Sequence, residues 1–301
     1  MKASLVVLIT VMALQIATAR DFRELTNLEG KKIKAELLDL KDGKLKIRAN
    51  SRVFEVPVDK LSQADQDFLT EWEAVRKGDE EQLYYKELVF EDDFSGEEFG
   101  ELWKHYKSES VVKDGVMIGK TVDIKVHAGC DSVRFEGRRD MEVAVKFNFV
   151  GEEAERFNVW FDDKDYKESH AGHISSISIS PTSLAISDAK TGNFKNEIYE
   201  KRKSAEGLDE ATQEMLKSKT VRFDLDLKRE KWHELLIRTK ADKLVVKIDG
   251  KEVGAFQSEG VAHMTKSLVS LTTNVNDVHY DDLVIKSAPN SAIKEDQEEA
   301  K

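Results

Sequence analysis

The chain has 301 residues, of which 47 are basic and 58 acidic, giving a net charge of −11. This balance excludes broad binding to nucleic acid or to an anionic membrane surface, because a basic patch supplies most of the affinity for either. Cys130 is the only cysteine, so no intramolecular disulfide can form and the domains must be stabilised by apolar cores. We interpret Cys130 as a small buried or half-buried residue.

The first nineteen residues, MKASLVVLITVMALQIATA, have the pattern of a secretory signal peptide. One lysine precedes an apolar run from Leu5 to Leu14, and Ala17-Thr18-Ala19 forms a small-x-small cleavage site. The run is shorter than the roughly 20 apolar residues that cross a bilayer, and no later segment predicts membrane insertion. We predict that residues 1–19 are removed after Ala19 and that the protein is secreted or periplasmic. The remaining 282 residues (301 less 19) predict about two domains.

Three Asp-Gly pairs lie between short segments of β-forming residues, at Asp42-Gly43, Asp114-Gly115 and Asp249-Gly250. Such pairs favour type I′ hairpin turns, because both central residues of this turn need a positive φ. The chain is therefore predicted to be mainly antiparallel β.

The first predicted domain covers residues 20–78. Apolar residues alternate on both sides of the first Asp-Gly pair and again from Phe54 to Val58, which predicts a small curled sheet. One helix follows, with Ser62 as its expected N-cap and Gly78 as its expected end. Residues 79–87 are predicted to form a polar linker.

The segment LEGKKIKAELLDLKDGKLKIRANSRVFEVPVDKLSQADQDFL, from Leu28 to Leu69, resembles the SLA homology domain. The KDGK hairpin, the strand ending in Val-Pro and the Lys-Leu-Ser start of an acidic helix carry the resemblance. It implies that residues 20–78 form a small SH3-like barrel with one helix, which binds a peptide or protein partner or braces its neighbour.

The second predicted domain covers residues 88–287. Apolar residues alternate strictly from Met141 to Phe149 and from Val221 to Leu227, as expected of strands that bury one face. Many such strands predict a two-sheet sandwich. Residues 188–220 break the pattern as a charged insertion with a short predicted helix at 208–217, and residues 288–301 are predicted to be an acidic, disordered tail.

This second domain resembles the concanavalin-like jelly rolls, specifically the laminin-G-like and family-16-glycosidase-like domains labelled as keto-disaccharide hydrolases. The blocks FEDDFSGEEFGELW, GHISSISIS, KWHELLIRTKADKLVVKIDGKEV, GVAHMTKSLVSL and VHYDDLVIK carry the resemblance by their order. It implies a concanavalin-like antiparallel β-sandwich. Within the third block we interpret Trp232 and His233 as scaffold, with the ring of Trp232 packed where strands enter the sandwich and His233 hydrogen-bonded locally.

Enzymatic activity is left open by the sequence. Family-16 glycosidases carry Glu-x-Asp-x-Glu on the catalytic strand, and the nearest approach here, Glu91 to Ser95, has a serine where the third acid should be. A weaker alternative uses Asp224 and Asp226, two apart on one strand, with His173 as a further acid-base group. The competing interpretation of Asp224 and Asp226 is a solvated polar surface.

Sugar binding needs an exposed aromatic ring beside polar groups, and Trp160 is the best candidate. It alternates away from apolar neighbours, so we expect it to share an outer face with Asn158 and with polar residues of other strands. The full set of candidate ligand contacts is Trp160, Asn158, Lys146, Asn148, His173, His263 and Lys266, with Asp224 and Asp226 on the same face. The alternatives are that Trp160 packs half-buried under a loop and that the histidines and Lys266 form structural hydrogen bonds.

No cofactor is predicted apart from a possible structural calcium ion. Asp92 and Asp93 would lie beside Asp281 and Asp282 if the first and last strands of the domain pair, and clustered carboxylates suit a hard cation. The alternative is that these acids protect a sheet edge from aggregation.

Three functional hypotheses follow from the sequence. The favoured one is an exported, lectin-like protein that recognises a glycan or cell-envelope component and carries an SH3-like protein-binding or bracing module. The alternatives are a carbohydrate-active hydrolase or lyase acting on a modified disaccharide and a structural scaffold of an envelope complex. Fold resemblance alone does not decide among them.

Overall fold

The structure is a computed structural model that describes residues 22–50, 52–273 and 278–289. The predicted signal peptide and all but the first two residues of the predicted tail lie outside these ranges. The chain divides into two compact units between Glu81 and Gln82. None of the described helices is long and apolar enough to cross a membrane.

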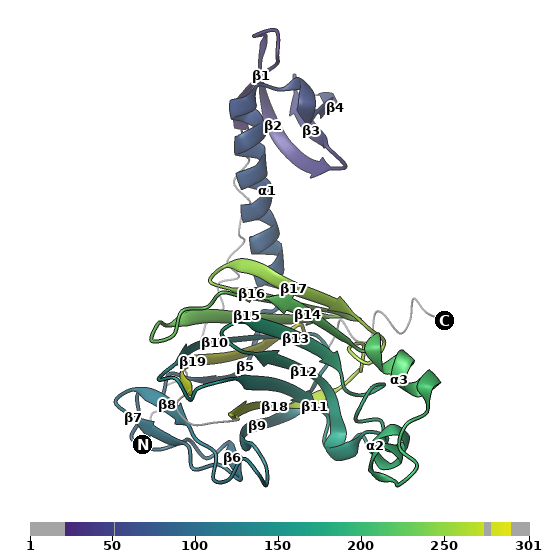
Figure 1. Cartoon of the computed structure of the whole chain (residues 1–301). Helices are drawn as coiled ribbons and strands as arrows, with labels where there is room; N and C mark the ends of the chain where they lie inside the picture. Colours follow the sequence, from purple (N-terminus) through teal and green to yellow (C-terminus); the bar gives the residue numbers. More distant parts are fainter. Residues whose placement is uncertain (1–21, 51, 274–277, 290–301) are drawn as a thin grey trace, which may run out of the picture. The chain divides into compact units, whose positions relative to one another are not determined.

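The N-terminal unit is a four-stranded antiparallel sheet, followed by a 3-10 turn and one long helix (Figure 1). The elements are β1 (Phe22–Thr26), β2 (Lys32–Lys41), β3 (Lys44–Ala49), β4 (Arg52–Pro57), η1 (Val58–Lys60) and α1 (Gln63–Tyr84). The strands pair in chain order. Asp42 and Gly43 have φ values of 51° and 72°, which confirms the predicted hairpin. The strand β1 was not predicted.

The carboxylate of Asp65 ties the start of α1 to the sheet. It is buried, and it accepts hydrogen bonds from the Thr26 amide at 2.8 Å, the Ser62 hydroxyl at 2.8 Å and Arg23 Nε at 2.9 Å. The Asp65 amide donates in turn to Ser62 Oγ at 3.3 Å, which confirms Ser62 as the N-cap. The core beneath the helix contains Leu25, Ala35, Leu37, Leu45, Ile47, Ala49, Leu61 and Leu69.

The predicted end of the helix at Gly78 is wrong, because α1 continues to Tyr84. A glycine inside a helix costs only about 1 kcal/mol relative to alanine, and the good helix formers on both sides of Gly78 offset that cost. The predicted polar linker at 79–87 is therefore helical as far as Tyr84, and β5 begins at Glu87.

The C-terminal unit consists of two antiparallel sheets. The eight-stranded sheet contains β5 (Glu87–Asp92), β7 (Val111–Lys113), β8 (Val116–Gly119), β10 (Met141–Phe149), β15 (His233–Lys240), β16 (Lys243–Ile248), β17 (Lys251–Gln257) and β19 (Val278–Ser287). The seven-stranded sheet has the order β14 (Thr220–Asp224), β13 (Ser183–Asp188), β12 (His173–Ile179), β11 (Phe157–Asp162), β18 (Lys266–Thr273), β9 (Gly129–Arg138) and β6 (Trp103–Tyr106).

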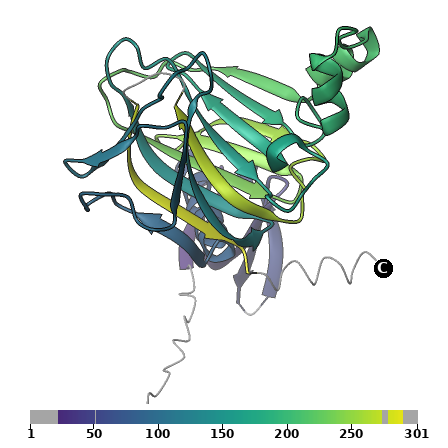
Figure 2. The same ribbon diagram turned by 90° about the horizontal axis from the view of Figure 1, so that it is seen from below.

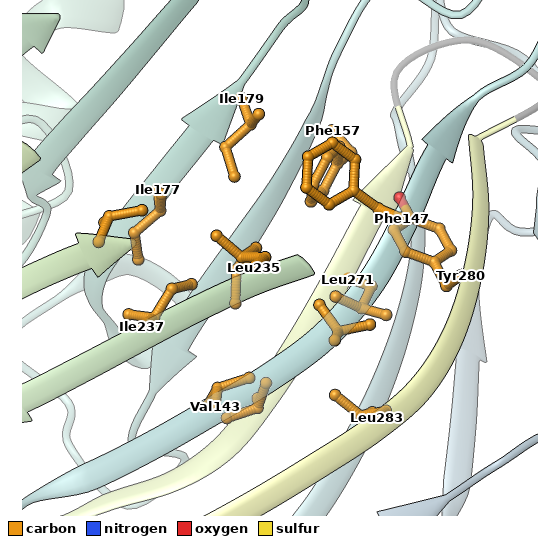
Figure 3. Close-up of a cluster of buried hydrophobic side chains, with 14 of the residues drawn as sticks. Val143, Phe147, Phe157, Ile177, Ile179, Leu235, Ile237, Leu271, Tyr280 and Leu283 are labelled. Atoms are coloured by element: carbon orange, nitrogen blue, oxygen red, sulfur yellow. The ribbon is translucent and has the colours of Figure 1, made fainter. Parts of the chain in front are cut away.

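One apolar core lies between the two sheets (Figure 3). On β10 the alternating residues Met141, Val143, Val145, Phe147 and Phe149 are all buried, as predicted. They meet the inward residues of the other sheet, among them Phe157, Ile177, Ile179 and Leu271. Each large side chain buried in this way contributes about 1.5–3 kcal/mol. The predicted mainly antiparallel β-sandwich is confirmed.

The charged insertion contains two helices, α2 (Asn196–Lys203) and α3 (Glu210–Lys217), which lie together beside the sandwich (Figure 2). The helix α3 matches the predicted segment and is capped by Asp209, whose carboxylate accepts a hydrogen bond from the Thr212 amide at 2.8 Å. The helix α2 was not predicted, because its charged sequence buries only Ile198.

The other two hairpin turns and the Trp232-His233 pair were also predicted from the sequence. The pairs Asp114-Gly115 and Asp249-Gly250 both have positive φ, which confirms two further hairpins. His233 is buried, with Nδ1 at 2.8 Å from Asp249 Oδ2 and Nε2 at 3.1 Å from the Lys228 carbonyl oxygen, so its predicted scaffold role is confirmed. The packing predicted for Trp232 is found only in part, because this side chain is 39% exposed.

Candidate functional site

The outward side chains of the seven-stranded sheet form a surface that we call the polar face. On β11, Phe157, Val159 and Phe161 point into the core, so Asn158 and Trp160 point outward from the same strand. The predicted pairing of Asn158 with Trp160 on one outer face is confirmed.

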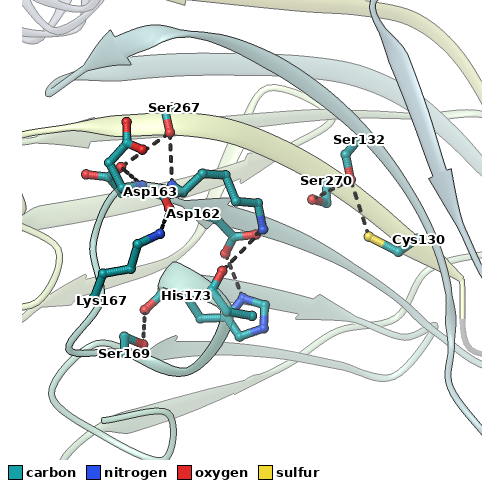
Figure 4. A network of polar contacts seen from close by, with 12 residues as sticks. Cys130, Ser132, Asp162, Asp163, Lys167, Ser169, His173, Ser267 and Ser270 are labelled. Atoms are coloured by element: carbon teal, nitrogen blue, oxygen red, sulfur yellow. Dashed lines mark hydrogen bonds and ion pairs between the residues drawn. The ribbon is translucent and has the colours of Figure 1, made fainter. Parts of the chain in front are cut away.

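Small hydroxyl side chains surround this pair. Trp160 lies opposite Ser176 on one neighbouring strand and Ser270 on the other, while Asn158 lies opposite Ser178 and Thr272. The Ser132 and Ser270 hydroxyls are 3.0 Å apart, and Cys130 Sγ is 3.4 Å from Ser132 Oγ (Figure 4). Serine and threonine present donors and acceptors close to the sheet without long side chains above it. On the β12 side Ser176 and Ser178 are half-buried and reach the surface, whereas on the β18 side Ser270 and Thr272 are buried and bonded to Ser132 and Asn158.

The ring of Trp160 belongs to an aromatic cluster. The ring of His173 lies 4.4 Å from it and that of Phe194 5.3 Å from it, measured between centroids. His173 Nδ1 is 2.7 Å from Asp162 Oδ1, and this contact fixes the imidazole (Figure 4). Because Phe194 comes from the 188–220 insertion, the expectation of a half-buried Trp160 packed against a loop is correct. Trp160 and His173, both predicted as ligand contacts, are brought together.

A groove of about 480 Å³ opens on the same face, near the ends of β12 and β13. Its lining consists of Glu155, Arg156, Ser178, Ser180, Pro181, Thr182, Ser183, Ala185, Arg222 and Arg229. Sequence reasoning missed this groove. The one signal in the sequence was Arg222, which alternates outward between Val221 and Phe223 on β14.

The expectation that Lys146 and Asn148 share the face of Trp160 is wrong. Both belong to β10, which lies in the eight-stranded sheet. Alternation shows which side chains of a strand point outward, but it does not show which of two sheets the strand joins. Lys146 Nζ instead lies 2.5 Å from Asp282 Oδ2, and that contact raises the pKa of the lysine.

The prediction that Lys266 contacts a ligand is also wrong, because its side chain is 0% exposed. Its Nζ donates to the carbonyl oxygens of Arg139 at 2.6 Å and His263 at 3.1 Å. Burial lowers the pKa of Lys266 to about 7. His263 Nε2 lies 2.9 Å from Asp163 Oδ2, so its observed role is the structural alternative.

The three groups of the hydrolase hypothesis do not form one site. Asp224 is the last residue of β14, and Asp226 lies beyond the end of this strand. Lys228 Nζ donates to Asp226 Oδ1 at 2.9 Å, and both aspartates are exposed. His173 is the first residue of β12. Asp224 lies opposite Ser183 of β13, and Ser183 lies next to the other end of β12. These positions are about 23 Å apart along the strand direction, which excludes concerted acid-base chemistry.

The predicted neighbourhood of the four aspartates is present, since Asp92 of β5 lies opposite Leu283 of β19. Asp92 accepts hydrogen bonds from the Phe94 amide at 2.8 Å and Trp103 Nε1 at 2.7 Å, and Asp282 contacts Lys146. Across the described ranges, no group of three or more His, Cys, Asp or Glu side chains is placed to hold a metal. The strand β19 that carries Asp281 and Asp282 pairs with strands on both sides, so the edge-protecting alternative does not apply to these two residues, and calcium binding stays a prediction.

No protein-family model matches the sequence, and no curated protein is significantly similar to it. Solved structures are similar at a low level. A sialidase aligns with 68% of this chain at 12% identity and a TM-score of 0.45, over 19% of the sialidase chain. The carbohydrate-binding module CBM66 from Bacillus subtilis aligns with 62% of this chain and 96% of its own, at 9% identity and a TM-score of 0.43.

SCLam, a non-specific endo-β-1,3(4)-glucanase from family GH16, aligns with 67% of this chain and 91% of its own, at 10% identity and a TM-score of 0.45. Because all three TM-scores are below 0.5, these similarities do not establish the fold. The sandwich is established by the strand pairing of the structure itself. The resemblance of residues 20–78 to the SLA homology domain stays a prediction. The C-terminal unit is thus a two-sheet antiparallel β-sandwich with an aromatic and hydroxyl-rich polar face.

Proposed function

We propose that the protein binds a glycan, without cleaving it, through the polar face of the seven-stranded sheet. The observation that carries this proposal is the position of Trp160 among the hydroxyls of Ser176, Ser270 and the neighbouring strands. We further propose that the protein is exported and that its N-terminal unit binds a protein or braces its neighbour.

The chemistry of this face fits a sugar. A pyranose ring has an apolar face of C–H groups, which stacks on an aromatic ring, and an edge of hydroxyls, which need donors and acceptors. Trp160 offers a half-buried ring, and the half-buried hydroxyls of Ser176 and Ser178 offer the polar partners. Because His173 and Phe194 hold the indole in place, little side-chain entropy remains to be lost on binding.

Binding is favoured over hydrolysis because the acid-base groups proposed for catalysis do not converge: His173 starts β12, whereas Asp224 ends β14 and Asp226 contacts Lys228. Retaining and inverting glycosidases both need two carboxyl groups on opposite sides of one glycosidic bond. Asp162, two residues along β11 from Trp160, is buried and holds His173, while Asp224 lies on the edge strand β14. A polysaccharide digestion assay that released product would contradict the non-catalytic part of the proposal.

The test is a glycan array probed with the full chain, followed by calorimetric titration of the hits. We expect Trp160→Ala to weaken binding by about tenfold or more, the loss typical of a central aromatic contact. Lys146→Gln is the matched control, because Lys146 is on the other sheet and its variant should bind as the wild type does. An array without hits, or equal affinities for wild type and Trp160→Ala, would contradict the proposal.

A further inference from the structure

The groove next to Trp160 carries an unusual concentration of positive charge for this chain. Three arginines line it, Arg156, Arg222 and Arg229, against a single acid, Glu155. The chain as a whole has a net charge of −11. A basic groove on an acidic protein is a local exception that attracts a ligand of opposite charge.

Two of these guanidinium groups are available to a ligand. Arg156 and Arg222 are exposed, and within the described residues neither side chain makes a hydrogen bond or an ion pair, even with Glu155. Several arginines elsewhere are engaged, as with Arg23 on Asp65 at 2.9 Å and Arg48 on Glu36 at 2.7 Å, although Arg52 and Arg134 are exposed as well. The groove therefore presents cationic groups whose hydrogen-bonding capacity is unused by the protein.

The third arginine makes the groove rigid. Arg229 Nη1 donates to the carbonyl oxygens of Gly151 and Ala154, both at 2.8 Å, and so anchors the segment that leads to Arg156. On the opposite wall, the amides of Leu225 and Leu227 donate to the carbonyls of Thr182 and Pro181 at 2.9 Å and 2.8 Å. Both walls are thus held by backbone contacts, which reduces the ordering cost of binding.

The groove and the aromatic ring belong to one continuous surface. Ser178 lines the groove and lies two residues from Ser176, the cross-strand partner of Trp160. Residues two apart on a strand share a face at a separation of about 7 Å. Arg222 lies opposite Ala185, which in turn lies opposite Ser178, so Arg222 ends the row of side chains that contains Asn158.

We propose that the glycan bound by the polar face is acidic, with a carboxylate or sulfate group held in the groove by Arg156 and Arg222 while a neighbouring sugar stacks on Trp160. This inference rests on the proposed function and specifies its ligand. Guanidinium groups pair with planar carboxylates and with sulfate oxygens through two parallel hydrogen bonds, a geometry that lysine cannot offer. The hydroxyls of Ser178, Thr182 and Ser183 serve the remaining sugar oxygens.

The test is calorimetric titration of the full chain with three sets of oligosaccharides of equal length: oligogalacturonates, heparin fragments and neutral laminarin fragments. We expect at least one acidic set to bind about tenfold or more tightly than the neutral set, with an affinity that falls as salt is raised. The two acidic sets distinguish a carboxylate from a sulfate ligand, and tighter binding of either one supports the proposal.

The double variant Arg156→Gln with Arg222→Gln should remove this preference and leave neutral binding unchanged. The matched control is Lys243→Gln with Lys251→Gln, which removes two exposed charges from the eight-stranded sheet and should preserve the preference. Equal affinity for acidic and neutral sugars, or an unchanged preference in the arginine variant, would overturn the acidic ligand while leaving glycan binding intact. Absence of binding to any glycan would overturn the proposed function itself.

Discussion

The two sheets of the sandwich have outward faces of different character. On the eight-stranded sheet, long charged side chains neutralise one another, as with Arg238 Nε on Glu142 Oε2 at 2.7 Å and Lys146 on Asp282 at 2.5 Å. On the polar face of the seven-stranded sheet, short hydroxyls surround an aromatic ring, and Arg156 and Arg222 make no ion pair in the described chain. The charges of the first face contact one another, whereas the second face keeps Ser176, Ser178, Arg156 and Arg222 without a side-chain partner among the described residues.

This difference shows where to look for function in a sandwich whose strands all alternate in the same way. Both sheets place polar residues outward, so polarity alone does not mark a site. The distinguishing property is whether the polar groups have partners within the protein. Exposed cations that make no ion pair can bind an anionic group directly, whereas paired charges must first be separated.

The largest expected effect concerns Lys266, which among the described residues of the seven-stranded sheet is the one wholly buried cation. Its pKa is about 7 in the folded chain and returns to about 10.5 on unfolding, so the unfolded chain binds more protons between these values. Stability should therefore rise with pH across this window, by about 1.4 kcal/mol per pH unit. Urea unfolding on either side of about pH 8 measures this slope.

Lys266→Met supplies the comparison for that slope. The variant removes the titrating group while keeping an unbranched chain of similar length, so its stability should change less with pH than that of the wild type. Parallel pH profiles for the two proteins would show that Lys266 keeps an ordinary pKa despite its burial.

A smaller effect is expected on the eight-stranded sheet, where Glu142 and Arg238 are 11% and 13% exposed. Glu142→Leu removes the carboxylate that Arg238 contacts, and the free energy of unfolding should fall by about 1–3 kcal/mol. Glu142→Gln keeps a hydrogen-bond acceptor for Arg238, so its free energy of unfolding should fall by less. Glycan affinity should be the same for both variants, and a loss of affinity would move the binding site to the eight-stranded sheet.

Much of the fold could be predicted from local patterns. Alternation located most strands of the sandwich, the Asp-Gly pairs marked three hairpins, and Ser62 marked the start of a helix. The errors came from weak signals. Gly78 carried too small a penalty to end a helix, and α2 has too little apolar surface to be recognised from its sequence.

The site was harder to predict because it depends on tertiary placement. Trp160, Asn158 and His173 were found because one strand and one hairpin bring them together. Lys146 and Asn148 were assigned to the wrong sheet because long-range pairing decides which sheet a strand joins. Lys266 was predicted to reach a ligand because the sequence does not show that its ammonium group bonds to the Arg139 and His263 carbonyl oxygens inside the protein. The arginine groove joins β12, β13, β14 and the loops that carry Arg156 and Arg229, so no local pattern could reveal it.

The most direct test of the central claim uses the four tryptophans as local probes. Trp160 lies on the polar face, Trp232 precedes β15 of the eight-stranded sheet, Trp103 is buried and Trp72 belongs to the N-terminal unit. The chain is labelled with fluorotryptophan, its resonances are assigned by single Trp→Phe variants, and it is titrated with oligogalacturonates and heparin fragments. We predict that fluorine NMR will show a saturable shift at Trp160 and none at Trp232. A shift at Trp232 alone, or no shift at any tryptophan, would contradict glycan binding by the polar face.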